Sequence, residues 1–166
     1  SPKEIMTIEG NRKEIPIKKF STYHLFQWNG IQFSVYNCYE LTDILHRSIF
    51  RSELDILFAI EYNRDVNYFS NISESVSRDL HCYYVQANTS NYGDSRVVEP
   101  KKRDYQNPVR VKGGDNDVIL SYVLDIASLR KFQSQTHNLQ KDHKEFKMTP
   151  PDFQHKKVNK RGNSNI

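Results

Sequence analysis

The stretch IQFSVYNCYEL, from Ile31 to Leu41, decides the fold because the periodicity of its apolar residues changes within it. Ile31, Phe33 and Val35 alternate with residues that carry polar groups, and this period of two is typical of a strand. After Cys38 the apolar residues recur with a helical period instead. The stretch therefore predicts a cysteine at the end of a strand and directly before a helix.

The residues before this stretch predict a β-hairpin. An aromatic-rich run, His24–Trp28, is separated from the strand Ile31–Asn37 by Asn29 and Gly30. An Asn-Gly dipeptide between two such runs is the strongest short signal for a hairpin turn. Residues 1–22 have few aligned apolar positions, and we expect an irregular entry segment there.

Strands and helices alternate after Cys38. One helix is expected around residues 41–49, and the apolar run Leu54–Ile60 predicts a strand buried on both faces. A second helix follows, with Asp65 or Asn67 as its cap, and His81–Ala87 is the next strand. This order predicts an α/β layered sheet. The residues that define the two helices are Leu41, Ile44, Leu45 and Ile49 in the first, and Phe69, Ile72, Val76 and Leu80 in the second.

The pattern weakens toward the end of the sequence. Ser95–Val98 predicts a short strand, residues 101–108 predict a polar turn region, and residues 112–116 predict a loop. Asp117–Ile126 predicts a further strand that leads into a helix starting at Ala127. We therefore divide the chain into an entry segment at residues 1–22, a folded domain at residues 23–132 and a basic, flexible tail at residues 133–166.

Positive charge is concentrated in that tail. The whole chain of 166 residues has a net charge of +4. From Lys131 onward, eight basic residues oppose three acidic ones, so residues 1–130 carry a net charge of −1. A solvated tail is the simplest interpretation, and contact with nucleic acid through it is the alternative.

Composition and cysteine usage argue against several classes of protein. No apolar run approaches the roughly 20 residues that a membrane-spanning helix needs, and the chain does not open on a secretory signal. The two cysteines, Cys38 and Cys82, make no disulfide scaffold and lack the spacing of metal ligands. We therefore expect a cytoplasmic protein without membrane contact, metal or cofactor.

Cys38 is predicted where a nucleophile would be effective. Active sites of open α/β sheets lie at the carboxyl ends of their strands. The partial positive charge at a helix N-terminus stabilises a thiolate, and backbone N–H groups such as that of Tyr39 can bind a developing oxyanion. A small buried core residue is the alternative for Cys38. Cys82 lies near the start of a predicted strand and is interpreted as core.

Several segments over about residues 23–130 together resemble the second half of the nitrilase superfamily of carbon–nitrogen hydrolases. Members of that family carry a Cys-Tyr-Asp/Glu stretch at the nucleophile, followed by a buried strand, a helix and a strand that ends in Ala-Asn. The matching features are Cys38-Tyr39-Glu40, Leu54–Ile60, Arg78, Ala87-Asn88, Gly93-Asp94-Ser95, Val97-Val98-Glu99-Pro100 and Asp117–Leu129.

This resemblance implies the fold and the chemistry of the family. The fold would be the C-terminal half of an α/β/β/α sandwich, which often pairs into dimers, so a homo-oligomer is expected. The chemistry would use a Glu–Lys–Cys set, in which Cys38 attacks the carbon of a small amide or nitrile and forms a thioester. The stretch SPKE resembles the family's Pro-x-Glu element, so Glu4 would be a second, substrate-positioning glutamate.

The chain also departs from the family pattern. The general-base glutamate and the catalytic lysine would both lie upstream of Ser1, so the resemblance implies a C-terminal piece with little activity of its own. The family's Arg-Phe-Pro-Glu continuation is replaced by Leu41–Ile44, so substrate preference does not carry over. Glu61 and Asn63 follow a predicted strand and, like Tyr39, are expected to line the substrate pocket, with helix capping as the alternative.

Two longer strings resemble a narrower group of proteins. EYNRDVNYFSNI, from Glu61, and SRDLHCYYVQANTSNYGDSR, from Ser77, are similar to the nitrilase-like C-terminal region of bacterial reverse-transcriptase fusion proteins thought to act in phage defence. That resemblance implies an alternative function, a non-catalytic interaction or assembly module. Transfer of the acyl group to an amine instead of water is a third possibility, because it uses the same thioester.

Overall fold

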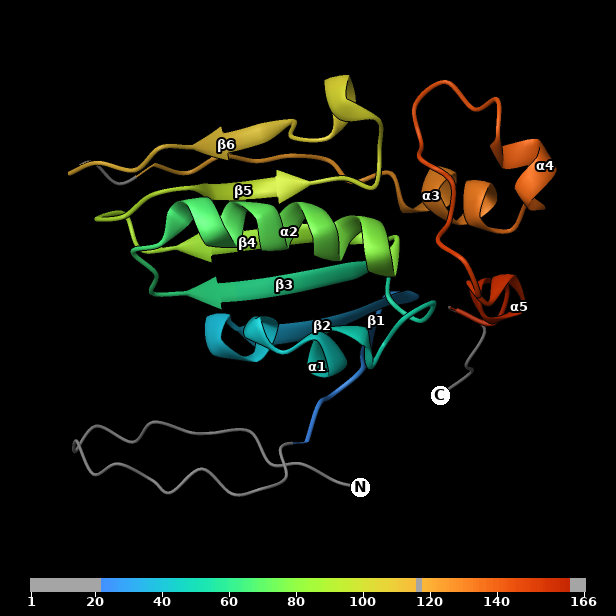
Figure 1. Cartoon of the computed structure of the whole chain (residues 1–166), viewed down its shortest axis with the longest axis horizontal. Coiled ribbons are helices and arrows are strands. Elements are labelled where there is room, and N and C mark those ends of the chain that lie inside the picture. The colour runs from blue at the N-terminus through green and yellow to red at the C-terminus, as the bar shows by residue number, and fades with distance from the viewer. Residues whose placement is uncertain (1–21, 116–117, 162–166) are drawn as a thin grey trace.

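The computed structural model describes residues 22–115 and 118–161, which form one six-stranded sheet with helices on both sides (Figure 1). The strands follow one another across the sheet in sequence order. They are β1 (Phe26–Trp28), β2 (Ile31–Asn37), β3 (Ile56–Glu61), β4 (Tyr83–Asn88), β5 (Ser95–Val98) and β6 (Val109–Val111). The helices are η1 (Cys38–Thr42), α1 (Ile44–Ser48), α2 (Val66–Leu80), η2 (Arg103–Tyr105), α3 (Ile126–Gln133), α4 (His137–Gln140) and α5 (His155–Val158).

The three middle strands run parallel. β2 pairs with β3 and β3 with β4 in parallel register, whereas β1, β5 and β6 are antiparallel to their neighbours. The hairpin between β1 and β2 turns at Asn29 and Gly30, which both have positive φ angles, as the predicted two-residue turn requires. Parallel pairing brings the carboxyl ends of β2, β3 and β4 to one edge of the sheet.

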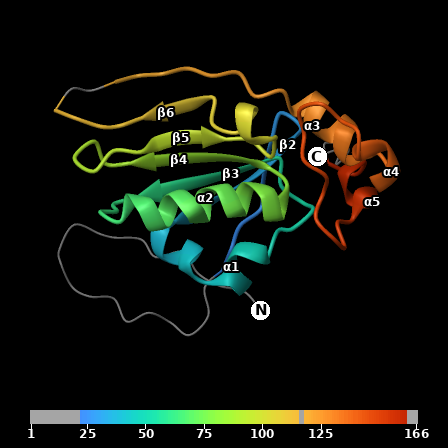
Figure 2. The ribbon, with the colours of Figure 1, turned by 45° about the horizontal axis from the view of Figure 1, so that its top comes forward.

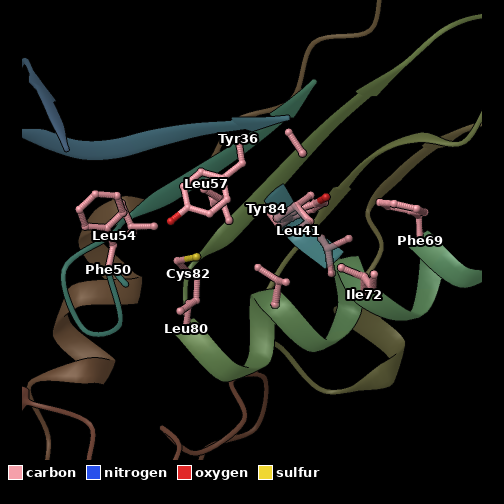
Figure 3. Packing of buried hydrophobic residues seen from close by; sticks show 13 residues of the cluster. Tyr36, Leu41, Phe50, Leu54, Leu57, Phe69, Ile72, Leu80, Cys82 and Tyr84 are labelled. Atoms are coloured by element: carbon pink, nitrogen blue, oxygen red, sulfur yellow. The ribbon is translucent and has the colours of Figure 1, made fainter. Parts of the chain in front are cut away.

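Helix α2 covers one face of the sheet. Its N-terminus is capped by Asp65, whose carboxylate accepts a hydrogen bond from the N–H of Tyr68 at 3.1 Å. Its apolar stripe is buried as predicted and packs on β2, β3 and β4 (Figure 3). Burying each large apolar side chain stabilises the fold by about 1.5–3 kcal/mol. The stripe consists of Phe69, Ile72, Val76 and Leu80.

The helix predicted after Cys38 is divided into η1 and α1. The backbone at Asp43 is extended, and its carboxylate accepts hydrogen bonds from the N–H groups of Leu45 at 2.7 Å and His46 at 3.1 Å. This cap starts a second helix, so the predicted common apolar face does not form. Ile44 and Leu45 are 69% and 73% exposed, whereas Leu41 is buried.

The strand predicted at Asp117–Ile126 is not formed in the part of it that the structure describes. Residues 118–125 have no regular structure and run back along the β6 side of the sheet, as Figures 1 and 2 show. Ile119 and Val123 are 97% and 88% exposed. The prediction was wrong because an apolar run becomes a strand only when it finds a hydrogen-bonding neighbour. Conversely, β6 forms between the predicted turn region and the predicted loop, at residues to which the sequence assigned no element.

The second face of the sheet is apolar but only partly covered. Ile56 and Tyr83 pack with Leu129 and Phe132 of α3 and with Phe146. Further along the same face, toward the carboxyl ends of the parallel strands, Val35 and Ile60 are among the exposed apolar residues. The face of the sheet under α2 therefore has a complete hydrophobic core, whereas the opposite face has a core only near the amino ends of the parallel strands.

The tail expected to be solvated is packed against the domain over residues 133–161 (Figure 2). It forms α4 and α5, and it buries Phe146, Phe153 and Val158. Its last described residue, Arg161, is also buried. The expectation was wrong because these apolar residues are widely spaced in the sequence. They do not recur with the period of a helix or a strand, so no periodic pattern predicts their burial.

A buried carboxylate, Asp55, holds this tail to the sheet. Its Oδ1 accepts hydrogen bonds from Arg130 Nε at 2.9 Å and from Arg161 Nη1 at 3.1 Å. Its Oδ2 accepts from the N–H of Gln32 at 2.8 Å. A buried charge is tolerated only when it is paired and hydrogen-bonded, and Asp55 meets both conditions. The carboxylate therefore joins β2, the start of β3, α3 and the tail.

Replacing Asp55 with Ala should lower the free energy of unfolding by about 3–5 kcal/mol, because Arg161 would be left buried without a counter-charge. Urea denaturation followed by circular dichroism measures this change. Glu53→Gln is the matched control, since it removes the partly exposed pair with Lys157 and should cost less than about 1 kcal/mol. Equal losses in the two variants would contradict the central role of Asp55.

Candidate functional site

Cys38 lies where the sequence predicts it, at the carboxyl end of β2 and as the first residue of η1. The carboxylate of Glu40 accepts a hydrogen bond from the N–H of Asn37 at 2.8 Å and so fixes the turn between strand and helix. The thiol is half-buried and packs against the core beneath α2. The helix that follows is a single 3-10 segment of five residues, shorter than the sequence suggests.

Glu61 stands beside Cys38 on the neighbouring strand. Asn37 and Ile60 pair in the parallel ladder, so the residues that follow them, Cys38 and Glu61, lie at the same level of the sheet. Neighbouring strands are separated by about 4.8 Å. Both residues also lie close to Tyr84: burial raises the pKa of the Tyr84 phenol, and the charges of Glu61 and Cys38 raise it further.

The Glu61 carboxyl is buried and titrates near neutrality. It is 6% exposed, and burial raises its pKa to about 7. Its Oε1 accepts a hydrogen bond from the Tyr84 hydroxyl at 3.1 Å, which opposes this increase. Its Oε2 is buried without a hydrogen-bond partner among the described residues. A carboxyl group with these properties at a sheet edge is typical of functional sites.

Asn63 takes part in the turn that leads from β3 into α2, in line with the structural alternative to a pocket residue. Its Oδ1 accepts a hydrogen bond from the N–H of Asp65 at 3.0 Å, which shapes the turn into α2. Its own N–H donates to Asn88 Oδ1 at 3.0 Å, and Asn88 Nδ2 donates back to the Asn63 carbonyl oxygen at 3.0 Å. The Nδ2 atom of Asn63 is buried and has no partner within residues 22–115 and 118–161. One side of this amide is therefore structural, and the side chain also acts on Glu61, where it lowers the pKa of the carboxyl.

The sequence did not identify a buried charged pair near Glu61. Arg96 of β5 is buried and donates to the carboxylate of Asp94 and to Ser70 Oγ, the latter at 2.6 Å. The charge of Asp94 raises the pKa of Glu61, and that of Arg96 lowers it. Alternation along β5 places Arg96 on the same face as the buried Val98, and this was the available signal.

The sheet edge thus brings together Cys38, Glu61 and Asn63. Tyr39 is 75% exposed, and its carbonyl oxygen accepts a hydrogen bond from the Thr42 hydroxyl at 2.7 Å. Glu4 lies outside the described residues. Within the described ranges, no three His, Cys, Asp or Glu side chains are grouped as metal ligands. No helix there has the length and apolar character needed to cross a bilayer.

Comparison with known proteins gives a likeness of fold. No protein-family model and no curated protein sequence matches the chain. A solved structure that it resembles is XC1258 from Xanthomonas campestris, a CN-hydrolase superfamily protein with an arsenic adduct in the active site. The TM-score is 0.56 at 13% identity, over 78% of this chain and 54% of XC1258.

Two structures of an amidase are less similar. An amidase from Nesterenkonia sp. gives a TM-score of 0.40 at 16% identity, over 51% of this chain and 38% of that one. A mutant of the Nesterenkonia sp. AN1 amidase in complex with butyramide gives 0.41 at 14% identity, over 57% and 40%. The likeness to XC1258 confirms the predicted α/β fold class, and the present chain spans about half the length of that protein.

Stability should depend on pH through Glu61. The folded state holds the Glu61 proton up to a pKa of about 7, whereas the unfolded state releases it near the ordinary value of 4.5. The folded state therefore loses about 2–3 kcal/mol of stability as pH rises between these values. Glu61→Gln should lack this loss. Urea denaturation of both proteins at pH 5, 6, 7 and 8 measures it, and parallel curves would contradict the raised pKa.

Proposed function

We propose that this chain is the C-terminal part of a carbon–nitrogen hydrolase-like domain whose nucleophile is Cys38. The observation that carries the proposal is the position of Cys38, at the carboxyl end of a central parallel strand and beside a buried carboxyl group. The fold is similar to that of XC1258, a CN-hydrolase superfamily protein. The substrate class is a small amide or nitrile, and Tyr39, Glu61 and Asn63 are proposed to line its pocket.

The proposed reaction passes through a thioester. The Cys38 sulfur forms a bond to the carbonyl carbon of an amide, the C–N bond breaks, and the nitrogen leaves with a proton as ammonia or an amine. Water then attacks the thioester, which releases the acid and restores the thiol. The Asn37 side chain accepts the N–H of Glu40 in the first turn of η1, and the N–H of Tyr39 is proposed to stabilise the oxyanion. The sequence resemblance assigns the general base and the lysine to residues upstream, with Glu4 positioning the substrate.

The uncovered sheet face supports the proposal that another part of the domain is needed. The face presents Val35 and Ile60, and the neighbouring segment 118–124 exposes further apolar side chains. Contiguous exposed apolar surface on a soluble protein usually marks an interaction site. A second sheet packed on this face would complete an α/β/β/α sandwich. The coverage of about half of XC1258 fits this arrangement.

The second candidate is a non-catalytic assembly module of a reverse-transcriptase-associated defence protein in the cytoplasm. The same exposed apolar surface favours it, and so does α1, whose Ile44 and Leu45 are exposed. In this alternative, copies of the chain or another domain would bind through these surfaces, and the basic residues of the tail would contact nucleic acid. The thiol of Cys38 would then have no chemical role.

Residues 1–166 alone should hydrolyse small amides slowly or not at all, because the proposed base and lysine are not among them. A longer protein that includes the upstream half should release ammonia from acetamide or butyramide, and Cys38→Ser should abolish that release. Ammonia detection measures both. Turnover by residues 1–166 that is lost in Cys38→Ser would contradict the need for an upstream half.

Thiol labelling separates the two candidates. Burial raises the pKa of the fully buried Cys82 to about 12, so this thiol should be inert in the folded protein. A nucleophilic Cys38 should react with Ellman's reagent at least about 100-fold faster than Cys82. Mass spectrometry of the labelled peptides assigns each reaction. A Cys38 as inert as Cys82 would favour the assembly module.

A further inference from the structure

The loops that follow β3 and β4 bring two tyrosines and an arginine together on the surface, at the same edge of the sheet as Cys38. Arg64 Nε donates a hydrogen bond to the Tyr92 hydroxyl oxygen at 2.8 Å, and its guanidinium carbon lies 5.5 Å from the centre of the Tyr92 ring. The ring of Tyr62 meets that of Tyr92 edge-on, with 5.4 Å between the ring centres. The proposed hydrolysis makes no use of this group.

Hydrogen bonds fix the two loops relative to each other. The N–H of Asn63 donates to Asn88 Oδ1 at 3.0 Å, and Asn88 Nδ2 donates to the carbonyl oxygens of Asn63 at 3.0 Å and Gly93 at 2.8 Å. The N–H groups of Tyr92 and Gly93 both donate to the Thr89 carbonyl oxygen. The arginine and the phenol each lie one residue from a position that Asn88 holds, so their contact is set by the backbone of both loops.

Gly93 fixes the Tyr92 loop further. Its φ angle is +73°, and a side chain there would place its Cβ 1.6 Å from the Lys112 carbonyl oxygen, so the position requires glycine. The loop is therefore packed closely against the residue that follows β6. A surface contact between two flexible side chains usually stabilises little. Here the backbone of both partners is already ordered, so less freedom is lost when the contact forms.

Both neighbours of the Tyr92 oxygen favour its ionised form. The hydrogen bond from the Tyr62 hydroxyl lowers the pKa of the Tyr92 phenol, and the Arg64 guanidinium lowers it further. Tyr62 is 71% exposed, Arg64 is exposed and Tyr92 is half-buried, so the group borders solvent. A tyrosine is a stronger nucleophile once its phenol is ionised. The arrangement thus combines a rigid loop, a cationic hydrogen-bond donor and access from solution.

We propose that Tyr92 is an acyl-acceptor site, a nucleophilic phenol that takes an acyl group from an activated acyl donor such as a thioester. The phenol oxygen forms a bond to the acyl carbon, the bond from that carbon to the leaving group breaks, and the leaving group departs with the phenol proton. The product is an aryl ester on Tyr92. Arg64 and Tyr62 are positioning residues that stabilise the phenolate. This inference goes beyond the proposed hydrolysis and does not depend on it.

Acetylation of residues 1–166 by N-acetylimidazole tests the inference. The matched tyrosine is Tyr105 of η2, which is 51% exposed and whose hydroxyl has no arginine partner among the described residues. At neutral pH Tyr92 should be acetylated at least about fivefold faster than Tyr105, because a hydrogen bond from a charged donor stabilises the phenolate. Since Tyr105 is the more exposed of the two, exposure alone predicts the opposite order. Mass spectrometry of the labelled peptides measures both rates, and release by hydroxylamine identifies the ester.

Variants assign the effect to the neighbours of Tyr92. Arg64→Gln should lower the Tyr92 rate to about that of Tyr105, and Tyr62→Phe should lower it about threefold. Arg78→Gln is the matched control, because it removes an exposed arginine from the opposite end of α2 and should keep the wild-type ratio. In NMR spectra of the protein with ¹³C-labelled tyrosine, the Tyr92 phenol should titrate at a lower pH in the wild-type chain than in Arg64→Gln.

Equal acetylation of Tyr92 and Tyr105 in the wild-type chain overturns the inference. A faster Tyr92 that is unchanged in Arg64→Gln, with an unchanged titration, overturns the role of the guanidinium and with it the proposed activation. The wild-type ratio decides the matter even if Arg64→Gln does not fold. None of these measurements involves Cys38, so failure of this inference and failure of the proposed function are recognised separately.

Discussion

The buried carboxylate of Asp55 is the interaction on which the rest of this structure depends. It lies one residue before β3, the central parallel strand, and it is paired with two arginines that are 75 and 106 residues further along the chain. Because a buried charge without partners is costly, the start of β3 can be buried only where α3 and the tail also pack. The same strand ends at Glu61, so the anchor and the candidate site occupy the two ends of one strand.

Much of the parallel part of the sheet could be predicted from local sequence. The hairpin at Asn29-Gly30, the strand in LDILFAI and the helix capped by Asp65 each combine a strong period with a specific turn or cap, and each lies in the structure where it was expected. The run at Asp117–Ile126 has an equally clear apolar pattern, yet residues 118–125 form no strand. Strand pairing needs a neighbour, which the pattern of one segment does not reveal.

The candidate site was predictable to a smaller extent. The ends of parallel strands meet at one edge, and this rule predicts from the sequence that Cys38, Glu61 and Asn63 lie near one another. The surroundings of Glu61 could not be foreseen in the same way. Tyr84 reaches it across the sheet, and Arg96 and Asp94 approach from an antiparallel strand whose register depends on a loop. Such contacts follow from the assembled sheet and not from the spacing of residues.

The position of Arg161 has a consequence for how the chain is made. During synthesis the amino-terminal residues leave the ribosome first, and domains fold as units once their contacts can form. Asp55 obtains its last counter-charge only when the 106 residues that separate it from Arg161 have been synthesised. A nascent chain that does not yet include Arg161 has a buried and only partly neutralised carboxylate at the start of β3. Closure of the fold around Asp55 therefore waits for a guanidinium group that is distant from it in the sequence.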